Sequence, residues 1–358
     1  MTPLENHIVG LIRQGGPIPL DAFMDIALGH AQYGYYRTRD PLGQRGDFIT
    51  APEISQMFGE LFGLWCIDMW QKLGSPSSLN LIEFGPGRGT LMADTLRAAK
   101  LVPAFGTAAK VTFVETSPTL RAEQMKRVPD ASWIEQSGDL PPGPSLIVAN
   151  EFFDALPIRQ FQQTDSGWKE RCVALSTQSK NATPNFEFCL SDETCDPSLL
   201  PANVRQAPVG SIAEICPLGQ QIAGDLARHL AAAPAAALII DYGYAHSAAG
   251  DTFQALKGHA YVSPLADPGE ADLTAHVDFA ALARTANGAT SHGPVDQGAF
   301  LKALGIDARA SILMANAKPH QRQEVEAAHH RLTDPTAMGS LFKVMALTSR
   351  GIPVPAGF

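Results

Sequence analysis

Three glycines in a short turn are the residues whose spacing first suggests chemistry. Gly85, Gly87 and Gly89 lie within Glu83–Thr90 (EFGPGRGT), after the apolar run Leu79–Phe84 and before a stretch with a helical pattern. Glycine lacks a Cβ atom, so the backbone of such a turn can approach a ligand closely. The following helix would offer free N–H groups and the positive end of its dipole. The turn therefore predicts a binding site for a carboxylate or a phosphate.

The spacing of the turn and the residue before it select among ligands. A dinucleotide fingerprint has the pattern G-x-G-x-x-G, whereas here the third glycine comes one residue early and is followed by Thr90. No Gly-Lys-Ser/Thr follows, so the turn is not a P-loop. The carboxylate of Glu83 would repel a phosphate and attract an ammonium group. The turn therefore favours S-adenosyl-L-methionine, whose methionine part carries an ammonium group, over a nicotinamide dinucleotide.

Two further carboxylates follow the next two apolar strands. Glu115 ends the run Val111–Glu115, and Asp139 comes shortly after Ala131–Ile134. A carboxylate at the end of the second strand can accept two hydrogen bonds from a ribose diol, and Asp139 would accept one from an adenine amino group. Either residue could instead cap a helix. Together with the glycine turn, the two acids predict a complete S-adenosyl-L-methionine site.

The fourth strand ends in polar residues that suggest where a methyl group is transferred. They belong to Asn150–Pro157 (NEFFDALP), and ligands of open α/β sheets bind at the carboxyl ends of strands. Glu151 and Asp154 are candidate catalytic residues, because paired carboxylates can hold a guanidinium, align its nitrogen and accept its proton. The alternative is that they cap a following helix. We assign Asn150 to the cofactor and Phe153 to the substrate.

Three more candidates lie outside these blocks. Asp241 ends the apolar run Ala236–Asp241 at the same sheet edge and is a candidate substrate-binding residue. His276 is a candidate catalytic base, although a lone histidine more often has a structural role. Residues 46–53 form a candidate lid, in which Glu53 either binds substrate or is an acid favoured in the first turn of a helix.

Alternating apolar strands and helices must position these residues, which predicts an α/β fold with a parallel sheet and crossover helices. We expect strands at residues 79–84, 111–115, 131–134, 146–150, 236–241, 289–295 and 341–347. We divide the chain into a helical N-terminal lid region (1–74), the first half of the cofactor-binding domain (75–157), a β-rich insertion for the substrate (158–210) and the second half of the domain with helical additions (211–358).

The composition excludes several classes of protein. The 358 residues have a formal net charge of −9 and no long Lys/Arg run, which disfavours general nucleic-acid binding. The five cysteines form no Cys-x-x-Cys pair, so neither a metal site nor a disulfide framework is indicated. No apolar run is long enough to span a membrane, and the first residues resemble neither a secretory signal nor a mitochondrial leader. We expect a soluble protein that stays in the compartment where it is made.

Five sequence blocks together resemble a known family. They are residues 46–55 (GDFITAPEIS), 83–89, 150–157, 241–244 (DYGY) and 272–279 (DLTAHVDF). In this order they resemble the mitochondrial complex I assembly-factor methyltransferases and their bacterial relatives, which are class I S-adenosylmethionine-dependent protein arginine methyltransferases. The block 150–157 is the most specific. One departure is Ala51, where the family more often has serine.

This resemblance implies a Rossmann-like class I methyltransferase fold with seven strands, of which the last, Leu341–Leu347, is antiparallel. It also implies symmetric dimethylation of an arginine in the 49-kDa-type subunit of respiratory complex I, so that the partner is a protein. Because no mitochondrial leader is found, we expect a bacterial, cytoplasmic member, and we also consider a homodimer. Two alternatives stay open: a methyltransferase for small molecules, and a non-catalytic assembly protein that binds S-adenosylmethionine.

Overall fold

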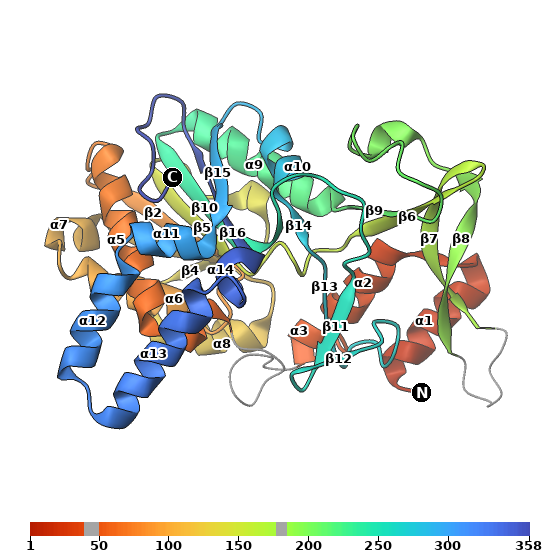
Figure 1. Cartoon of the computed structure of the whole chain (residues 1–358), viewed down its shortest axis with the longest axis horizontal. Coiled ribbons are helices and arrows are strands. Elements are labelled where there is room, and N and C mark those ends of the chain that lie inside the picture. Colours follow the sequence, from red (N-terminus) through yellow and green to blue (C-terminus); the bar gives the residue numbers. More distant parts are fainter. Residues whose placement is uncertain (39–49, 177–184) are drawn as a thin grey trace. The chain divides into compact units, whose positions relative to one another are not determined.

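The computed structural model of the chain describes residues 1–38, 50–176 and 185–358 (Figure 1). The chain divides into two compact units. Unit 1 comprises Met1–Phe48, Asp154–Gln221 and His246–Ala281, and unit 2 comprises Ile49–Phe153, Ile222–Ala245 and Leu282–Phe358. Each unit therefore combines segments that are distant in sequence. The predicted lid at residues 46–53 lies outside the described residues as far as Ile49.

Seven of the eight strands in the largest sheet belong to unit 2 and lie in the order β15-β16-β10-β5-β2-β3-β4 (Figure 1). They are β2 (Leu79–Phe84), β3 (Ala109–Val114), β4 (Ser132–Ile134), β5 (Ser145–Asn150), β10 (Ala235–Tyr244), β15 (Thr290–Asp296) and β16 (Phe342–Thr348). The strands from β4 to β10 are parallel to one another. β16 runs antiparallel to β10, and β15 runs antiparallel to β16. The predicted seven-stranded, mostly parallel sheet with an antiparallel last strand is confirmed.

The strand order reverses at β2. From β2 the chain continues to β3 and β4 on one side, whereas β5 and β10 lie on the other. Phe84 at the end of β2 pairs with Ala149 of β5, so Glu83 and Asn150 lie on neighbouring strands near the same sheet edge. Ligands of open α/β sheets bind at such a reversal of strand order. The fold therefore brings two predicted cofactor residues to the expected place.

The helices of unit 2 follow from apolar residues at helical spacing. In α5, the N-cap Ser55 accepts a hydrogen bond from the Met57 N–H, and the buried residues recur at helical spacing: Phe58, Leu61, Phe62, Trp65 and Met69. The helices are α4 (Ala51–Ile54), α5 (Gln56–Lys72), α6 (Thr90–Ala99), α7 (Pro103–Ala108), α8 (Pro118–Arg127), α11 (Gln297–Ala303), α12 (Ile306–Asn316), α13 (Pro319–Thr333), α14 (Met338–Leu341) and the greater part of α9 (Pro217–Ala232).

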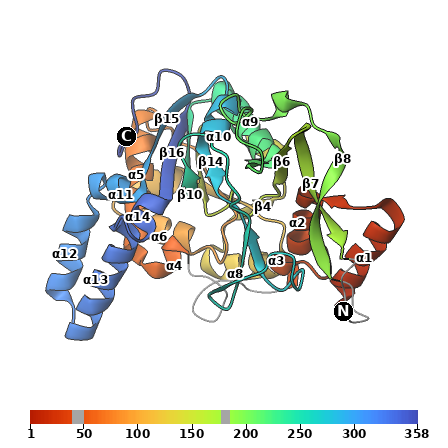
Figure 2. The ribbon, with the colours of Figure 1, turned by 45° about the vertical axis from the view of Figure 1, so that its right-hand side comes forward.

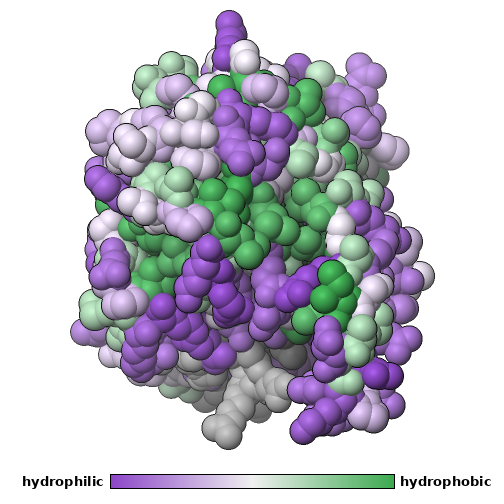
Figure 3. All heavy atoms as spheres, turned by 90° about the vertical axis from the view of Figure 1, so that its left-hand side faces the viewer, coloured by the Kyte–Doolittle hydropathy of each residue, from purple (hydrophilic) through white to green (hydrophobic). Residues whose placement is uncertain are grey.

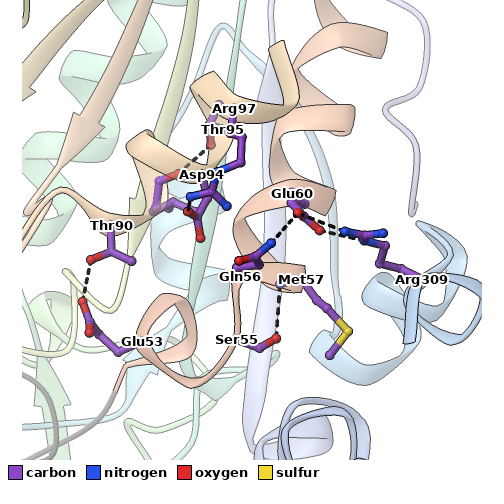
Figure 4. Close-up of polar contacts among 11 residues, drawn as sticks. Glu53, Ser55, Gln56, Met57, Glu60, Thr90, Asp94, Thr95, Arg97 and Arg309 are labelled. Carbon is purple, nitrogen blue, oxygen red and sulfur yellow. Dashed lines mark hydrogen bonds and ion pairs between the residues drawn. The ribbon is translucent and has the colours of Figure 1, made fainter. Parts of the chain in front are cut away.

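Two glycines allow α5 and α6 to pack closely. A Cβ atom on Gly59 would lie 2.5 Å from the Asp94 Cβ, and one on Gly63 would lie 2.7 Å from the Ala98 Cβ. Asp94 is buried on α6, where its carboxylate accepts a hydrogen bond from Arg97 at 2.6 Å (Figure 4). Because α6 starts directly after the glycine turn, this packing also fixes the position of the turn.

The described residues of unit 1 form helices and two small sheets (Figure 2). The first sheet has the order β1-β7-β6-β9, with β8 also paired to β7, and the second has the order β12-β11-β13. Its elements are α1 (Pro3–Gly15), α2 (Leu20–Gly29), α3 (Tyr35–Thr38), β1 (Ile18–Pro19), β6 (Arg159–Thr164), β7 (Gly167–Leu175), β8 (Phe186–Thr194), β9 (Ile212–Ile215), β11 (Gln254–Lys257), β12 (Ala260–Val262), β13 (Asp272–Thr274) and β14 (Val277–Asp278), with α10 (Phe279–Thr285) beginning at its end.

One face of unit 2 carries apolar side chains. Figure 3 shows an apolar area among hydrophilic side chains on the side where α5, α7 and α12 lie in Figure 1. Unit 2 exposes the large apolar side chains of Leu64, Leu101 and Ile312. Among the residues that the structure describes, no helix is both long and apolar enough to cross a membrane.

Candidate cofactor-binding and active site

The glycine turn requires glycine at all three of its positions. Gly85, Gly87 and Gly89 have φ angles of 58°, 54° and 78°, in the left-handed region that favours glycine. Gly89 is also the N-cap of α6. The sequence prediction of a sharp strand-to-helix turn is therefore confirmed, and a side chain at any of these positions would strain the backbone.

The turn is in contact with the block that follows β5. A Cβ atom on Gly85 would lie 2.8 Å from Cδ2 of Phe152, so the phenylalanine ring occupies the space that a larger residue would need. The same ring packs edge-on against Phe84, with the centroids 5.4 Å apart. The adjacent Phe153 is buried and packs against Phe152 at 5.4 Å. The glycine turn and the block that starts at Asn150 therefore pack against each other, although Gly85 and Asn150 are 65 residues apart in sequence.

Two buried polar groups at the ends of β2 and β5 are suited to a ligand with N–H donors. Glu83 is 3% exposed, and its burial raises the pKa of the carboxyl group well above its usual value. Within the described part of the chain, Glu83 Oε2 and Asn150 Oδ1 are buried without a hydrogen-bond partner. Buried acceptors rarely stay unpaired in native proteins. The residues present therefore fit an ammonium-bearing cofactor such as S-adenosylmethionine.

The predicted ribose-binding acid, Glu115, is held in a fixed orientation. It is 8% exposed at the end of β3, and its burial raises the pKa of its carboxyl group. Its Oε1 accepts from the Ser117 N–H at 2.7 Å, and its Oε2 accepts from Gln124 Nε2 at 3.1 Å. The N-cap of α8 is Ser117, so Glu115 does not cap that helix itself. The predicted adenine contact, Asp139, is exposed at the end of η1 (Ser137–Asp139).

Glu151 has a strained backbone and a directed carboxylate. Its φ angle is 50°, which is uncommon for a residue other than glycine. Its Oε1 accepts from the Ala51 N–H at 2.8 Å and from Asn150 Nδ2 at 3.2 Å. The alternative that Glu151 caps a following helix is wrong, because a turn leads from it to β6. The helix whose first N–H it accepts is α4, which lies 100 residues earlier.

Asp241 shapes the turn that contains Glu151. Its carboxylate is fully buried, and Oδ2 accepts from the backbone N–H groups of Phe152 (3.1 Å) and Phe153 (2.9 Å), while Oδ1 accepts from Tyr242 N–H (3.0 Å). Backbone bonds to a buried carboxylate fix the course of the chain. The structure thus gives Asp241 a positioning role, and its contact with a substrate stays a prediction.

Glu53 connects α4 to the start of α6. Its Oε1 accepts a hydrogen bond from the Thr90 hydroxyl at 2.5 Å (Figure 4), and its Oε2 lies 3.9 Å from Arg88 Nη1. The half-buried side chain of Arg88 is therefore paired with Glu53. The Gly85–Gly89 turn, the residues after β5 and the start of α4 are therefore linked within unit 2.

The remaining catalytic candidates, Asp154 and His276, belong to unit 1. The buried Asp154 accepts the Ala275 N–H on its backbone carbonyl at 2.9 Å, so the segments that carry the two candidates are neighbours. The His276 N–H donates to Thr252 Oγ1 at 2.9 Å, and the Thr252 hydroxyl in turn contacts the buried Glu214. Burial lowers the pKa of His276, which keeps its ring neutral near pH 7.

A surface cavity does not locate this site. A cavity of about 450 Å³ lies beside α6 and α7 and contains no predicted site residue. It is lined by Leu96, Ala99, Lys100, Pro103, Gly106 and Thr107.

The fold and the site define a class of protein. A mostly parallel sheet with an antiparallel last strand, a glycine turn at the reversal of strand order and buried acceptors beside it are the features of a class I methyltransferase. Residues 61–295 match the family described as S-adenosyl-L-methionine-dependent methyltransferase. The chain belongs to this family, and it is an enzyme that uses S-adenosyl-L-methionine.

Curated relatives and a solved structure agree with this assignment. The chain is 38% identical to the protein arginine methyltransferase NDUFAF7 homolog, mitochondrial, of Drosophila melanogaster, over 96% of this chain and 84% of the relative. It is 36% identical to the protein arginine methyltransferase NDUFAF7, mitochondrial, of Homo sapiens, over 97% and 83%. A crystal structure from Burkholderia thailandensis bound to S-adenosyl-homocysteine has 26% identity and a TM-score of 0.83, and covers 99% of this chain and 93% of that chain.

Proposed function

We propose that this enzyme methylates an arginine side chain of a protein, and that the reaction is the symmetric dimethylation of an arginine in the 49-kDa-type subunit of respiratory complex I. The observation that carries the proposal is the directed carboxylate of Glu151, held by α4 at the end of β5. A strained, oriented carboxylate at a ligand-binding sheet edge suits a guanidinium substrate. The names of the curated relatives support the same class of acceptor.

The cofactor residues in this proposal are the glycines of the turn and the polar groups around them. Glu83 and Asn150 would receive the ammonium group, Glu115 the ribose diol and Asp139 the adenine amino group. Gly85, Gly87 and Gly89 would leave room for the methionine part. When bound, the cofactor supplies a methyl carbon attached to a positively charged sulfur.

The acceptor side of the proposal depends on carboxylates. Glu151 and Asp154 would hold the guanidinium, aim one nitrogen at the methyl carbon and accept the proton that this nitrogen loses. His276 is the alternative proton acceptor, because a neutral ring can take a proton near pH 7. Glu53, Phe153 and Asp241 are the proposed substrate-binding residues.

The proposal also includes the oligomeric state of the enzyme and its cellular compartment. We keep a homodimer and the bacterial cytoplasm as predictions, while the names of the curated relatives describe mitochondrial proteins. Light scattering of the purified protein measures the oligomeric state directly. A single-chain mass at all concentrations would rule the dimer out.

Mass spectrometry of the methyl acceptor tests the proposal. The purified enzyme is incubated with S-adenosylmethionine and a recombinant 49-kDa-type subunit, and we expect two methyl groups on one arginine, one on each terminal nitrogen. Glu151→Gln should lower the rate about a hundredfold or more, whereas Glu326→Gln on the exposed face of α13 should leave it unchanged. An unmodified arginine with the wild-type enzyme would rule out this substrate. A wild-type rate in Glu151→Gln would remove Glu151 from the mechanism.

A further inference from the structure

Gln124 on α8 is completely buried between two parts of the proposed cofactor site. Its Nε2 donates to the Gly87 carbonyl oxygen at 2.8 Å and to Glu115 Oε2 at 3.1 Å. Its Oε1 accepts from the indole Nε1 of Trp133 in β4 at 2.7 Å. The side chain therefore connects the glycine turn, the end of β3 and β4.

The contact with Trp133 fixes which end of the amide faces the site. An indole N–H can only donate, so the atom that meets it must be the amide oxygen. The amide nitrogen then points at Gly87 and Glu115, and both of its N–H groups are used there. The turn also packs on α8 at this point, since a Cβ atom on Gly89 would lie 3.5 Å from the Gln124 Cα.

We propose that Gln124 is a positioning residue for S-adenosylmethionine, which sets the spacing and orientation of the Gly87 backbone and the Glu115 carboxylate. This rests on the proposed assignment of the turn to the methionine part and of Glu115 to the ribose. A preorganised site binds more tightly, because less order has to be imposed when the ligand arrives. Because one amide contacts both Gly87 and Glu115, it couples the subsite for the methionine part to the subsite for the ribose.

Calorimetric titration of the cofactor-free protein with S-adenosylmethionine measures this role. Gln124→Leu keeps the size of the side chain but leaves the Gly87 carbonyl, the Glu115 carboxylate and the Trp133 indole without this partner. We expect the affinity to fall about tenfold or more. Gln297→Leu is a matched control, since Gln297 is an equally buried glutamine of unit 2 that donates to the Leu332 carbonyl oxygen on α13. This control should lose stability without losing affinity.

The pH dependence of binding separates positioning from simple packing. In Gln124→Glu, a protonated carboxyl group can still donate one hydrogen bond towards Gly87 or Glu115. Once ionised, it would face the Glu115 carboxylate across a hydrogen-bond distance, with Arg121 of α8 as the nearby cation that contacts the Glu115 carbonyl oxygen. Two like charges at this distance disfavour the ionised pair. We expect the affinity of this variant to fall about tenfold or more between about pH 5.5 and about pH 8, relative to the wild type.

The outcomes distinguish this inference from the proposed site. Loss of affinity in Gln124→Leu and a steep pH profile in Gln124→Glu would support it, and the Glu variant decides the matter if the Leu variant fails to fold. Wild-type affinity and a wild-type pH profile in these variants, with binding lost in Gly87→Val, would overturn the role of Gln124 alone. Wild-type affinity in Gly87→Val as well would show that the cofactor binds elsewhere.

Discussion

Two features require glycine at position 87: its backbone conformation and the space that the proposed cofactor contact needs. Its φ angle of 54° is open to glycine, and an L-residue there is strained by roughly 1–2 kcal/mol. The side chain of Gly87→Val would also fill the space of the proposed cofactor contact, so we expect no measurable binding of S-adenosylmethionine by calorimetry.

The control for Gly87→Val is a glycine that tolerates a side chain. A Cβ atom on Gly106 in α7 would lie 3.7 Å from the Ala99 carbonyl oxygen, which is ordinary contact. Gly106→Ala should therefore bind S-adenosylmethionine as the wild type does. If a folded Gly87→Val variant also bound normally, the turn would not be the cofactor site.

Glu83 should release a proton when the cofactor binds. Burial raises the pKa of its carboxyl group well above the usual value, so the cofactor-free protein favours the protonated form of this group. A cationic ammonium group beside it would favour the ionised form. Calorimetry at about pH 6.5, where an α-amino group is still charged, in two buffers of different ionisation enthalpy measures the number of protons released.

The expected result is proton release in the wild type and none in Glu83→Gln, with an affinity that rises with pH only in the wild type. Affinity rises with pH because the bound ligand lowers the pKa of Glu83. At a higher pH, a smaller part of the binding free energy is needed to remove the proton from Glu83. Equal proton release in both proteins would assign the titration to another group.

The sequence predicted the part of the site whose residues are close together in the chain. It did not predict the contacts between residues that are distant in sequence. Gly85, Gly87 and Gly89 follow a strand at fixed spacing, so the pattern alone indicated the turn. Gln124 donates to a carbonyl 37 residues away, and Glu151 accepts from an N–H 100 residues away. No spacing rule connects such residues, because they meet only when the sheet and its helices are formed.

At the level of elements, the close packing of α5 on α6 holds the glycine turn in place. A Cβ atom on Gly63 would lie 2.7 Å from the Ala98 Cβ and 3.1 Å from the Thr95 carbonyl oxygen. Gly63→Leu must therefore push the helices apart. We expect it to lower the free energy of unfolding by about 1–3 kcal/mol, measured by urea denaturation.

The neighbouring residue supplies the control for Gly63→Leu. Leu64 lies on the same helix and is 44% exposed, so Leu64→Ala should change the free energy of unfolding by less than about 0.5 kcal/mol. S-adenosylmethionine affinity should fall in Gly63→Leu, because α6 begins at the glycine turn. Unchanged stability in Gly63→Leu would mean that α5 and α6 can separate without cost.

The elements that sequence predicted well are those with a strong apolar pattern. The core strands β2, β5 and β10 are runs of apolar residues, and the β6 and β7 hairpin lies in the predicted β-rich insertion. β8 (Phe186–Thr194) lies within the predicted β-rich insertion, but no individual strand was predicted at these residues. Its apolar residues are only half-buried, and its pairing with β7 stabilises it as a strand.

At the scale of the whole molecule, the two units interleave in the sequence. The helix α5 belongs to unit 2 although it lies in the predicted N-terminal lid region, and Asp154 and Phe153 are consecutive residues in different units. A division of the chain into consecutive segments follows changes of composition. Composition does not reveal which distant segments share a core, so the interleaving could not be predicted from this sequence.

Buried acids and histidines in both units make the stability of the whole chain depend on pH. Burial raises the pKa of Glu83, Glu115 and Glu214 and lowers the pKa of His229 and His276. A buried histidine with a lowered pKa adds stability as pH rises to the unfolded value of about 6.5, and its contribution is constant above that. A carboxyl group with a raised pKa contributes stability below its unfolded pKa of about 4.3, and this is lost as pH rises through its folded pKa.

Relative to Glu83→Gln, therefore, the wild-type protein should lose stability as pH rises from about 4.3 through the raised pKa of Glu83, because this carboxyl group ionises first in the unfolded chain. We expect the difference in Tm between these two cofactor-free proteins to change by a few degrees as pH rises, measured by scanning calorimetry. Glu83→Gln should have a flatter profile, because its amide does not ionise. Saturating S-adenosylmethionine should also flatten the wild-type profile, since its ammonium group would stabilise the ionised carboxylate. Parallel profiles in the wild type and in Glu83→Gln would show that the ionisation of Glu83 does not contribute to the pH dependence.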